Sequence, residues 1–386
     1  MSNGSVYQEL KPYTDQEFPG VLKKIIADEV FPELMAFVYP EIPVEDIRKK
    51  LLGFQTIQEF QHNFMAEAFG RIILKTSRGV TISGLENIHP DQSYLFIANH
   101  RDIILDSAVL QVLFVRNGLD TTEFAVGNNL MVSDFVADIG KINKMIIVIR
   151  DGSRRELLEY SKDLSAYIRE SVTTGRDSVW IAQRNGRTKN GDDRTDSGLL
   201  KMLFISGPSD FVSNFSELNL IPVSISYEIE PCDILKTQEV YLRSIGPYDK
   251  KPGEDLNSIL TGLRQQKGRI HLSIGNPLAY EDLQISPCST LNDKIAWLGQ
   301  EIDRQIHKNY HLWASNYIAF DILTGKSSHG KYSKEEMSAF EEYLHQKLAL
   351  LDGDHEKLKR IFLGVYANPV NNALKVSGQI PERSDD

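Results

Sequence analysis

The 386-residue chain has few of the features that mark secreted, metal-binding or membrane-spanning proteins. Its two cysteines, Cys232 and Cys288, stand in no CxxC or metal-type spacing, so we expect neither a disulfide framework nor a metal site. No apolar run approaches the roughly 20 residues that cross a bilayer. The first residues, Met1 to Thr14, lack the apolar stretch of a secretory signal. These absences favour a protein of a reducing compartment.

The chain also lacks an excess of basic charge. Its 43 Lys and Arg residues are outnumbered by 53 Asp and Glu residues, which gives a formal net charge of -10. Nucleic acid is therefore not an expected partner, and any anion site must be a local concentration of Arg and Lys. The apolar fraction of 41% and the charged fraction of 25% are typical of a globular protein with a sizeable core.

The hydrophobic period divides the chain into four parts. Residues 1–78 and 281–375 show helical patterns, residues 79–280 alternate between strand-like and helix-like segments, and residues 376–386 are predicted to be a disordered tail. Short apolar strands that alternate with helices predict an α/β fold, with a mixed, largely parallel sheet flanked by helices. The candidate strands are Val80–Ile82, Tyr94–Ala98, Phe124–Gly127, Met145–Ile149, Ser178–Ala182, Leu220–Tyr227, Val240–Ile245 and Arg269–Ile274.

The most informative segment runs from Phe96 to Asp106, where an apolar strand ends at Asn99-His100 and acidic residues follow. A histidine at a sheet edge is accessible to substrate, and a nearby carboxylate can accept a hydrogen bond from the second ring nitrogen and fix the tautomer. Such a pair forms a general base for a hydroxyl or an amine. The alternative is an exposed loop histidine with Asp106 capping the next helix. Asp102 is a second candidate partner for His100.

The string His100-Arg101-Asp102 also imitates the catalytic loop of protein kinases. That loop carries an asparagine five residues after its aspartate, where this chain has Ser107. No glycine-rich phosphate loop or Asp-Phe-Gly follows, so the kinase interpretation is discounted.

Three further segments end or follow predicted strands. The loop from Arg184 to Gly191 holds Arg184, Arg187 and Lys189 with two glycines, a composition that suits a phosphate, although a solvated basic loop is the plain alternative. Arg150 ends another apolar run and is a second candidate site residue. The alternative is that it caps the sheet edge and pairs with Asp151. Pro222 interrupts another apolar run, which suggests an edge strand or bulge beside a site, whereas a plain core strand is the simpler interpretation.

Together these segments resemble the glycerophospholipid acyltransferases, and within them the glycerol-3-phosphate acyltransferases. The family's first motif is Asn-His, four residues and Asp, which Asn99-His100 through Asp106 resembles. Val148-Ile149-Arg150 is similar to the second motif, an apolar run ending in Ile-Arg-Arg. The loop from Gln183 to Gly191 is similar to the third, and Ile221-Pro222-Val223 through Tyr227-Glu228 to the fourth. The resemblance covers about Gly79 to Leu278.

Two departures from the family pattern stand out. Five residues, instead of four, separate His100 from Asp106, which leaves Asp102 as an alternative partner. Gln183 stands near the position where the family has Glu, and the loop is about one residue longer. The anion site is therefore expected to suit a somewhat different headgroup.

The resemblance implies acyl transfer from acyl-CoA or acyl carrier protein to the hydroxyl of glycerol-3-phosphate or a lysophospholipid, within phospholipid biosynthesis and without a further cofactor. His100 would act as the general base, with Asp106 holding its tautomer. The implied substrate-binding residues are Asn99, Arg101, Arg150, Arg184, Arg187 and Lys189. The alternatives are another acceptor, such as the amine or hydroxyl of an aminolipid precursor, and a non-catalytic membrane-surface protein.

The implied partners are an acyl thioester, a phosphate-bearing lipid precursor and a membrane surface. We therefore expect a cytoplasmic protein, peripheral at the inner face of the membrane. The apolar N-terminal residues Phe31, Leu34, Met35, Phe37 and Val38 are candidates for an interfacial face, but packing on the α/β core is the favoured alternative.

Overall fold

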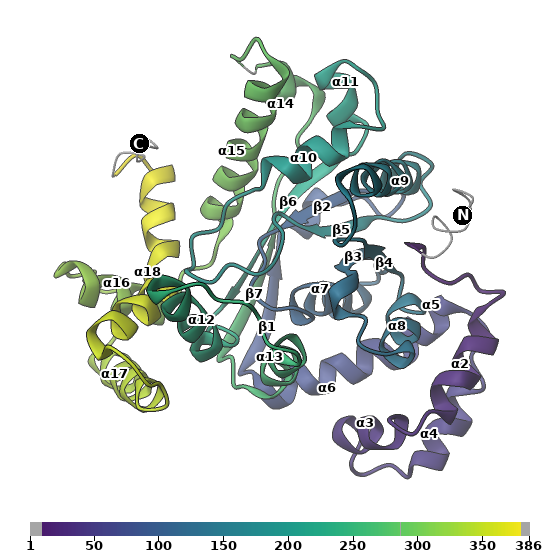
Figure 1. Ribbon diagram of the computed structural model, residues 1–386, viewed down its shortest axis with the longest axis horizontal. Helices are drawn as coiled ribbons and strands as arrows, with labels where there is room; N and C mark the ends of the chain where they lie inside the picture. Colours follow the sequence, from purple (N-terminus) through teal and green to yellow (C-terminus); the bar gives the residue numbers. More distant parts are fainter. Residues whose placement is uncertain (1–9, 286, 380–386) are drawn as a thin grey trace.

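The computed structural model describes residues 10–285 and 287–379, and within these ranges it contains a seven-stranded sheet with helices on both faces (Figure 1). The strand order is β1-β7-β6-β2-β5-β3-β4. The strands are β1 (Gly79–Ser83), β2 (Leu95–Ala98), β3 (Glu123–Gly127), β4 (Met145–Val148), β5 (Val179–Ala182), β6 (Leu220–Tyr227) and β7 (Arg269–Ile274).

The sheet is mixed but largely parallel, as the sequence predicts. Strand β2 pairs in parallel with β5 and β6, and β3 pairs in parallel with β5 and β4. Strand β7 runs antiparallel to β6, and β1 runs parallel to β7. The carboxyl ends of β2, β3, β4, β5 and β6 therefore meet at one edge of the sheet, the place where α/β proteins bind ligands.

Helices precede, connect and follow the strands. Before β1 come α2 (Phe18–Ala27), α3 (Phe31–Val38), α4 (Val44–Leu51), α5 (Ile57–Phe60), the π-helix η1 (Gln61–Met65) and α6 (Ala66–Thr76). Between strands lie η2 (Leu85–Asn87), α7 (Leu105–Arg116), η3 (Asn128–Leu130), α8 (Asp134–Lys141), α9 (Arg154–Thr173), α10 (Ser197–Phe204), α11 (Phe211–Ser216), α12 (Asp233–Ile245) and α13 (Glu254–Arg264). After β7 follow α14 (Tyr280–Gln284), α15 (Leu291–Asn309), α16 (Ala314–Thr324), α17 (Lys334–Leu348) and α18 (His355–Val376).

Successive side chains of the central strands enter two different cores. Leu95 and Ile97 of β2 pack with residues of α9, α10 and α15. Phe96 and Ala98 of the same strand pack against α7 on the opposite face. Because both faces are covered, all four residues of β2 are buried, which explains the unbroken apolar run.

The N-terminal helices form a separate apolar cluster with α8. Phe31, Met35 and Val38 are buried there, and Leu34 and Phe37 pack against the same cluster. These five residues are therefore engaged in packing and do not form an exposed interfacial face.

One strand prediction is corrected by the structure. The segment Val240–Ile245 lies in α12, whose buried face carries Asp233, Lys236 and Thr237. Because this buried face is polar, the apolar pattern did not reveal the helix. Pro222 lies in β6, an interior strand between β7 and β2, just before the pairing with β7 begins at Val223. The simpler interpretation, a plain core strand, is therefore confirmed, and the alternative of an edge strand is not. Of the predicted disordered tail, residues 380–386 lie outside the described residues, and α18 ends at Val376.

Candidate active site

His100 follows β2 at the shared carboxyl edge of the sheet, and its ring contacts Asp106 in the first turn of α7. The Nδ1 atom of His100 lies 2.9 Å from Oδ2 of Asp106. The same oxygen accepts hydrogen bonds from the backbone N–H groups of Arg101 (2.6 Å) and Asp102 (2.9 Å), and Oδ1 accepts one from the phenol of Tyr227 (2.8 Å). The carboxylate is thus fixed by three groups besides the ring that it orients.

The extra residue between His100 and Asp106 is absorbed by a turn capped by Asp102. Its Oδ1 accepts from the backbone N–H groups of Ile104 (3.0 Å) and Leu105 (2.8 Å), where α7 begins. Burial, together with the nearby Asp106, raises the pKa of Asp102. Asp106, rather than Asp102, therefore contacts the imidazole.

The second ring nitrogen of His100 is available for chemistry. The His100 side chain retains 13% of its exposure, and the edge of its ring meets Trp180 of β5 at a centroid distance of 6.2 Å. When Nδ1–H donates to Asp106, the neutral ring carries its lone pair on Nε2. No described residue is hydrogen-bonded to this nitrogen. The pair can therefore accept a proton from a group that enters from outside.

A polar pocket of about 600 Å³ opens in front of His100. Loops after β3, β4 and β5 and the helices α12 and α13 form its walls. It is lined by six cationic side chains and two carboxylates: Arg150, Arg184, Arg187, Lys189, Arg243, Lys250, Glu239 and Asp255. The excess of positive charge makes this pocket suitable for an anionic group.

Arg187 and Lys189 lie on the loop from Arg184 to Gly191, which we call the anion loop, and both side chains line this pocket. They differ in their hydrogen-bond and ion-pair partners. Arg187 is only 5% exposed, and its Nη1 has no hydrogen-bond partner among the described residues. Lys189 forms an ion pair with Glu239 of α12. Burial, reinforced by the charge of Arg187, lowers the pKa of Lys189 to about 8.

Arg150 and Arg184 also line the pocket, from the ends of β4 and β5. The guanidinium of Arg150 donates to Oδ1 of Asn129 at 3.2 Å, and burial lowers its pKa. The structure thus brings four predicted anion-binding residues into one pocket with His100.

Asn99 and Arg101 do not line this pocket, contrary to their expected role in substrate binding. Both are fully buried. The side chain of Asn99 bonds to the backbone of Ile225, and the guanidinium of Arg101 lies 2.6 Å from Asp193 and 3.3 Å from Glu230. The family resemblance implied substrate contact for both residues, whereas the strand pleat and the turn direct them into the protein.

Four charged pocket residues were not predicted from the sequence: Glu239, Arg243, Lys250 and Asp255. Arg243 lies in the segment Val240–Ile245, which was predicted to be a strand, and Glu239 directly precedes it. A helical assignment of Asp233–Ile245 would have placed them one turn apart on a common face. The pKa values of Glu239 and Asp255 are lowered because their Lys189 and Lys250 partners outweigh the effect of burial, so both side chains are carboxylates at neutral pH.

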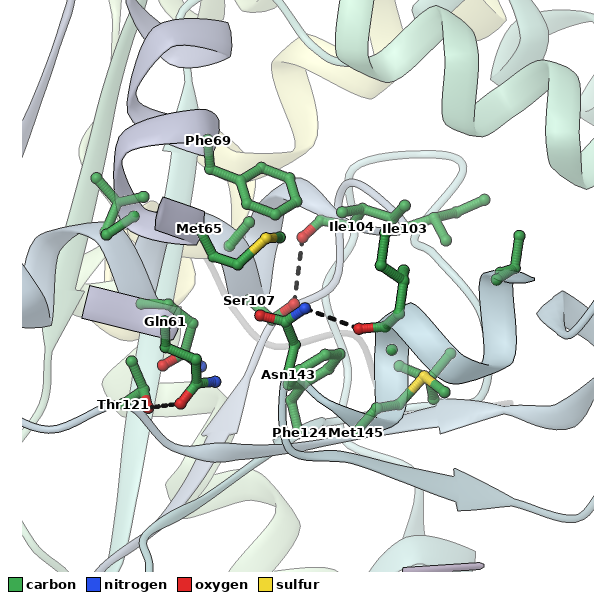
Figure 2. Close-up of a pocket in the computed structure, with 18 of the residues that line it drawn as sticks. Gln61, Met65, Phe69, Ile103, Ile104, Ser107, Thr121, Phe124, Asn143 and Met145 are labelled. Carbon is green, nitrogen blue, oxygen red and sulfur yellow. Dashed lines mark hydrogen bonds between the residues drawn. The ribbon is translucent and has the colours of Figure 1, made fainter. Parts of the chain in front are cut away.

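Figure 2 shows an apolar pocket of about 170 Å³. This pocket adjoins the polar one. Ile103, Val126 and Leu130 line both pockets. Met65 and Phe69 come from the helices before β1, so that region supplies part of the wall. No local sequence pattern indicates this pocket, because the residues that line it come from distant segments.

The polar side chains around the apolar pocket bond to one another or to the backbone. Thr121 donates to Gln61 at 2.6 Å, Ser107 donates to the carbonyl oxygen of Ile104, and Asn143 donates to the carbonyl oxygen of Ile139 (Figure 2). The free surface of the pocket is consequently hydrocarbon, which suits an alkyl chain.

Two kinds of feature are missing from the described parts of the chain. Across residues 10–285 and 287–379, no group of three or more His, Cys, Asp or Glu residues is arranged to hold a metal ion. None of the helices in these ranges is both long enough and apolar enough to cross a membrane.

A family model and a solved structure are similar to parts of this chain. Residues 79–226 match the family model described as Acyltransferase. Among solved structures, the chain is similar to the 1-acyl-sn-glycerophosphate (LPA) acyltransferase PlsC from Thermotoga maritima. The two share 13% identity with a TM-score of 0.41, over 76% of this chain and 96% of that one. Among curated proteins, nothing matches. The part of the chain that is similar to the acyltransferase family is thus the α/β region that carries His100 and the basic loop.

Proposed function

We propose that this acyltransferase moves a fatty acyl group from acyl-CoA or acyl carrier protein to the hydroxyl of glycerol-3-phosphate or a lysophospholipid. The observation that carries the proposal is the position of His100. Its ring is oriented by Asp106 and faces a cationic pocket, and that pocket shares Ile103, Val126 and Leu130 with an apolar one. A phosphate-bearing acceptor and an alkyl chain are the two ligands that such neighbouring pockets suit.

In the proposed reaction, the acceptor hydroxyl loses its proton to Nε2 of His100 as its oxygen attacks the thioester carbon. The resulting imidazolium is stabilised by Asp106. Collapse of the tetrahedral intermediate breaks the carbon–sulfur bond, and the departing thiolate takes the proton from the ring. Atoms and charges balance without a further reactant. General-base assistance of this kind contributes about 10²–10⁴ in rate.

The basic side chains would hold the phosphate of the acceptor. Arg187 is the strongest candidate, because a buried guanidinium nitrogen without a partner gains most from an incoming phosphate oxygen. Arg184, Lys189 and Arg150 add charge around it. By binding the phosphate, these side chains would both increase the affinity for the acceptor and hold its hydroxyl close to Nε2 of His100.

The substrates also suggest where the protein works. Lysophospholipids and acylated products reside in membranes, so we infer a peripheral position at the inner face of the cytoplasmic membrane. Flotation with liposomes that contain anionic lipid tests this inference, and failure to float with any liposome composition would contradict it.

The decisive test is an acyl-transfer assay with labelled palmitoyl-CoA and palmitoyl acyl carrier protein, each offered with glycerol-3-phosphate, lysophosphatidate and glycine. We expect an ester product with a phosphorylated acceptor, formed at least about a hundredfold more slowly by His100→Ala. An amide product with glycine alone would assign the enzyme to aminolipid synthesis. Equal inactivity of wild type and His100→Ala with every pair would support a non-catalytic role.

A further inference from the structure

The carboxylate of Asp193 bonds to residues from both halves of the proposed site. Its Oδ1 accepts from the hydroxyl of Thr188 at 2.7 Å. Its Oδ2 accepts from the guanidinium of Arg101 at 2.6 Å and from the amide of Asn99 at 3.2 Å. Thr188 stands between the anion-loop residues Arg187 and Lys189, whereas Asn99 and Arg101 flank His100. One buried side chain thus bridges the anion loop and the general base.

A second, direct bond runs alongside this bridge. The backbone N–H of Thr188 donates to the carbonyl oxygen of His100 at 2.8 Å. The same peptide group, between His100 and Arg101, is also held through its N–H, because the N–H of Arg101 donates to Asp106. A shift of Thr188 therefore moves the backbone that carries the imidazole.

The charge of Asp193 is matched inside the protein. Arg101 is fully buried, and its charge keeps the pKa of Asp193 below the usual value although burial alone would raise it. The fully buried Lys236 of α12 donates to the carbonyl oxygen of Arg101 (2.7 Å) and to Glu230 (2.6 Å), which also pairs with Arg101. Glu230 and Lys236 lie beyond the region that matches the family model.

The loop that carries Asp193 is also fixed from the C-terminal helices. Gly191 has a φ of +78°, and a Cβ atom there would lie 2.1 Å from the carbonyl oxygen of Val365 in α18. The ring of His307 in α15 lies 2.7 Å from the carbonyl oxygen of Asp193. The loop therefore has little freedom to move independently of the C-terminal region.

We propose that Asp193 is a positioning residue that couples the anion-binding loop to the general base through Thr188 and Arg101. The effect that this coupling is expected to have on kcat and KM rests on the proposed function. Occupation of the pocket by the phosphate of the acceptor is transmitted through this bridge to the orientation of His100. A residue that only stabilises the fold would not link phosphate binding to the state of the imidazole.

Thr188→Val tests the bridge with little change of shape, because it removes only the hydroxyl that bonds to Asp193. Thr188 does not line the pocket and is fully buried. We expect kcat to fall by about tenfold and KM for the phosphorylated acceptor to rise severalfold, whereas KM for the thioester stays unchanged. Thr188→Ser keeps the hydroxyl and should retain nearly wild-type values.

Thr195→Val is the matched control. It deletes a hydroxyl that donates to a different carboxylate, Asp303, at 2.6 Å, and Asp303 bonds to neither His100 nor the anion loop. We expect this variant to lose stability but to keep kcat and both KM values. Asp193→Asn is the more severe companion of Thr188→Val. If Asp193→Asn does not fold, Thr188→Val still tests whether the hydrogen bond between Thr188 and Asp193 couples the anion loop to His100.

A second measurement does not depend on turnover. The proton on Nδ1 of His100, bonded to Asp106, gives a downfield NMR resonance that His100→Ala identifies. Inorganic phosphate should shift this resonance in the wild type, and the shift should be much smaller in Thr188→Val. Absence of acyl transfer by the wild type would refute the proposed function without affecting this test. The coupling is refuted if phosphate shifts the resonance equally in both proteins, or if Thr188→Val matches Thr195→Val in kcat and KM.

Discussion

The phenol of Tyr227 donates a 2.8 Å hydrogen bond to Oδ1 of Asp106, so strand β6 fixes the carboxylate that orients the histidine after β2. Burial, together with the charge of Asp106, raises the pKa of Tyr227 well above its usual value, which keeps the phenol protonated and able to donate. The other oxygen of Asp106 is then left for the ring of His100 and two backbone N–H groups. The geometry of the base thus depends on two neighbouring strands.

His100→Ala should lower kcat for acyl transfer by about 10²–10⁴, since the general base is removed while both pockets remain. KM for the thioester should stay within about twofold of the wild type, because His100 does not line the apolar pocket. Steady-state kinetics with a thiol-release assay measure both quantities. A variant that retains more than a tenth of the wild-type kcat would show that His100 is not the base.

Asp106→Asn and Asp102→Asn distinguish the two acids near the histidine. Asp106→Asn removes the negative charge that holds the Nδ1–H tautomer and should reduce kcat by up to about 10⁴. Asp102→Asn keeps an oxygen that can accept from the first turn of α7, so its effect on stability should stay near 1 kcal/mol or less, with kcat nearly unchanged. Kinetics and thermal melts of both variants check this. A larger loss of kcat in Asp102→Asn than in Asp106→Asn would reverse the assignment.

Much of the site could be predicted because the polar residues follow apolar runs. In a largely parallel sheet, the carboxyl ends of such runs meet at one edge. His100, Arg150 and Arg184 follow β2, β4 and β5, and they line one pocket although 84 positions separate the first from the last. The predicted mixed, largely parallel sheet was confirmed for the same reason, since its buried strands read as continuous apolar segments.

The unpredicted parts depend on contacts that no local pattern encodes. Asn99 and Arg101 stand next to the histidine in the chain, but their partners, Ile225 and Asp193, come from distant segments. Helix α12 buries Lys236, so its inward face resembles a surface in the sequence. The wall of the apolar pocket joins residues before β1 to α7 and α8, which only the tertiary fold brings together.

Ala66→Phe should narrow the apolar pocket and shift the preference toward shorter acyl chains. Ala66 lines this pocket at the start of α6, and a phenyl ring would occupy much of its volume of about 170 Å³. The ratio of kcat/KM for octanoyl and palmitoyl thioesters measures the shift, which should exceed about tenfold. Leu74→Phe on the exposed side of the same helix, where Leu74 is 68% exposed, is the control and should leave the ratio unchanged. An unchanged ratio in Ala66→Phe would show that the acyl chain binds elsewhere.

Asp303→Asn should stabilise the protein at pH 8 but not at pH 5. Burial raises the pKa of Asp303 to about 7, above the ordinary value near 4 that it regains on unfolding. The folded protein therefore holds this proton more tightly, and the free energy of unfolding falls as pH rises from about 4 to about 7. Asparagine cannot ionise, so the variant avoids that loss. Thermal melts at both pH values test this, with Glu301→Gln on the same helix as control. A variant that melts below the wild type at pH 8 would contradict the prediction.

KM for a phosphorylated acceptor should rise when pH increases above about 8, because Lys189 then loses its proton. The cation is present below this pH and absent above it, whereas the acceptor phosphate, with a second pKa near 6, is fully charged across the whole range. If binding favours the protonated lysine, KM increases by at most about tenfold per pH unit over this interval. Lys189→Arg keeps its charge at pH 9 and should show a flat profile, and KM for the thioester serves as the internal control in both proteins. Parallel pH profiles for wild type and Lys189→Arg would remove Lys189 from the anion site and leave Arg150, Arg184 and Arg187 as its proposed cations.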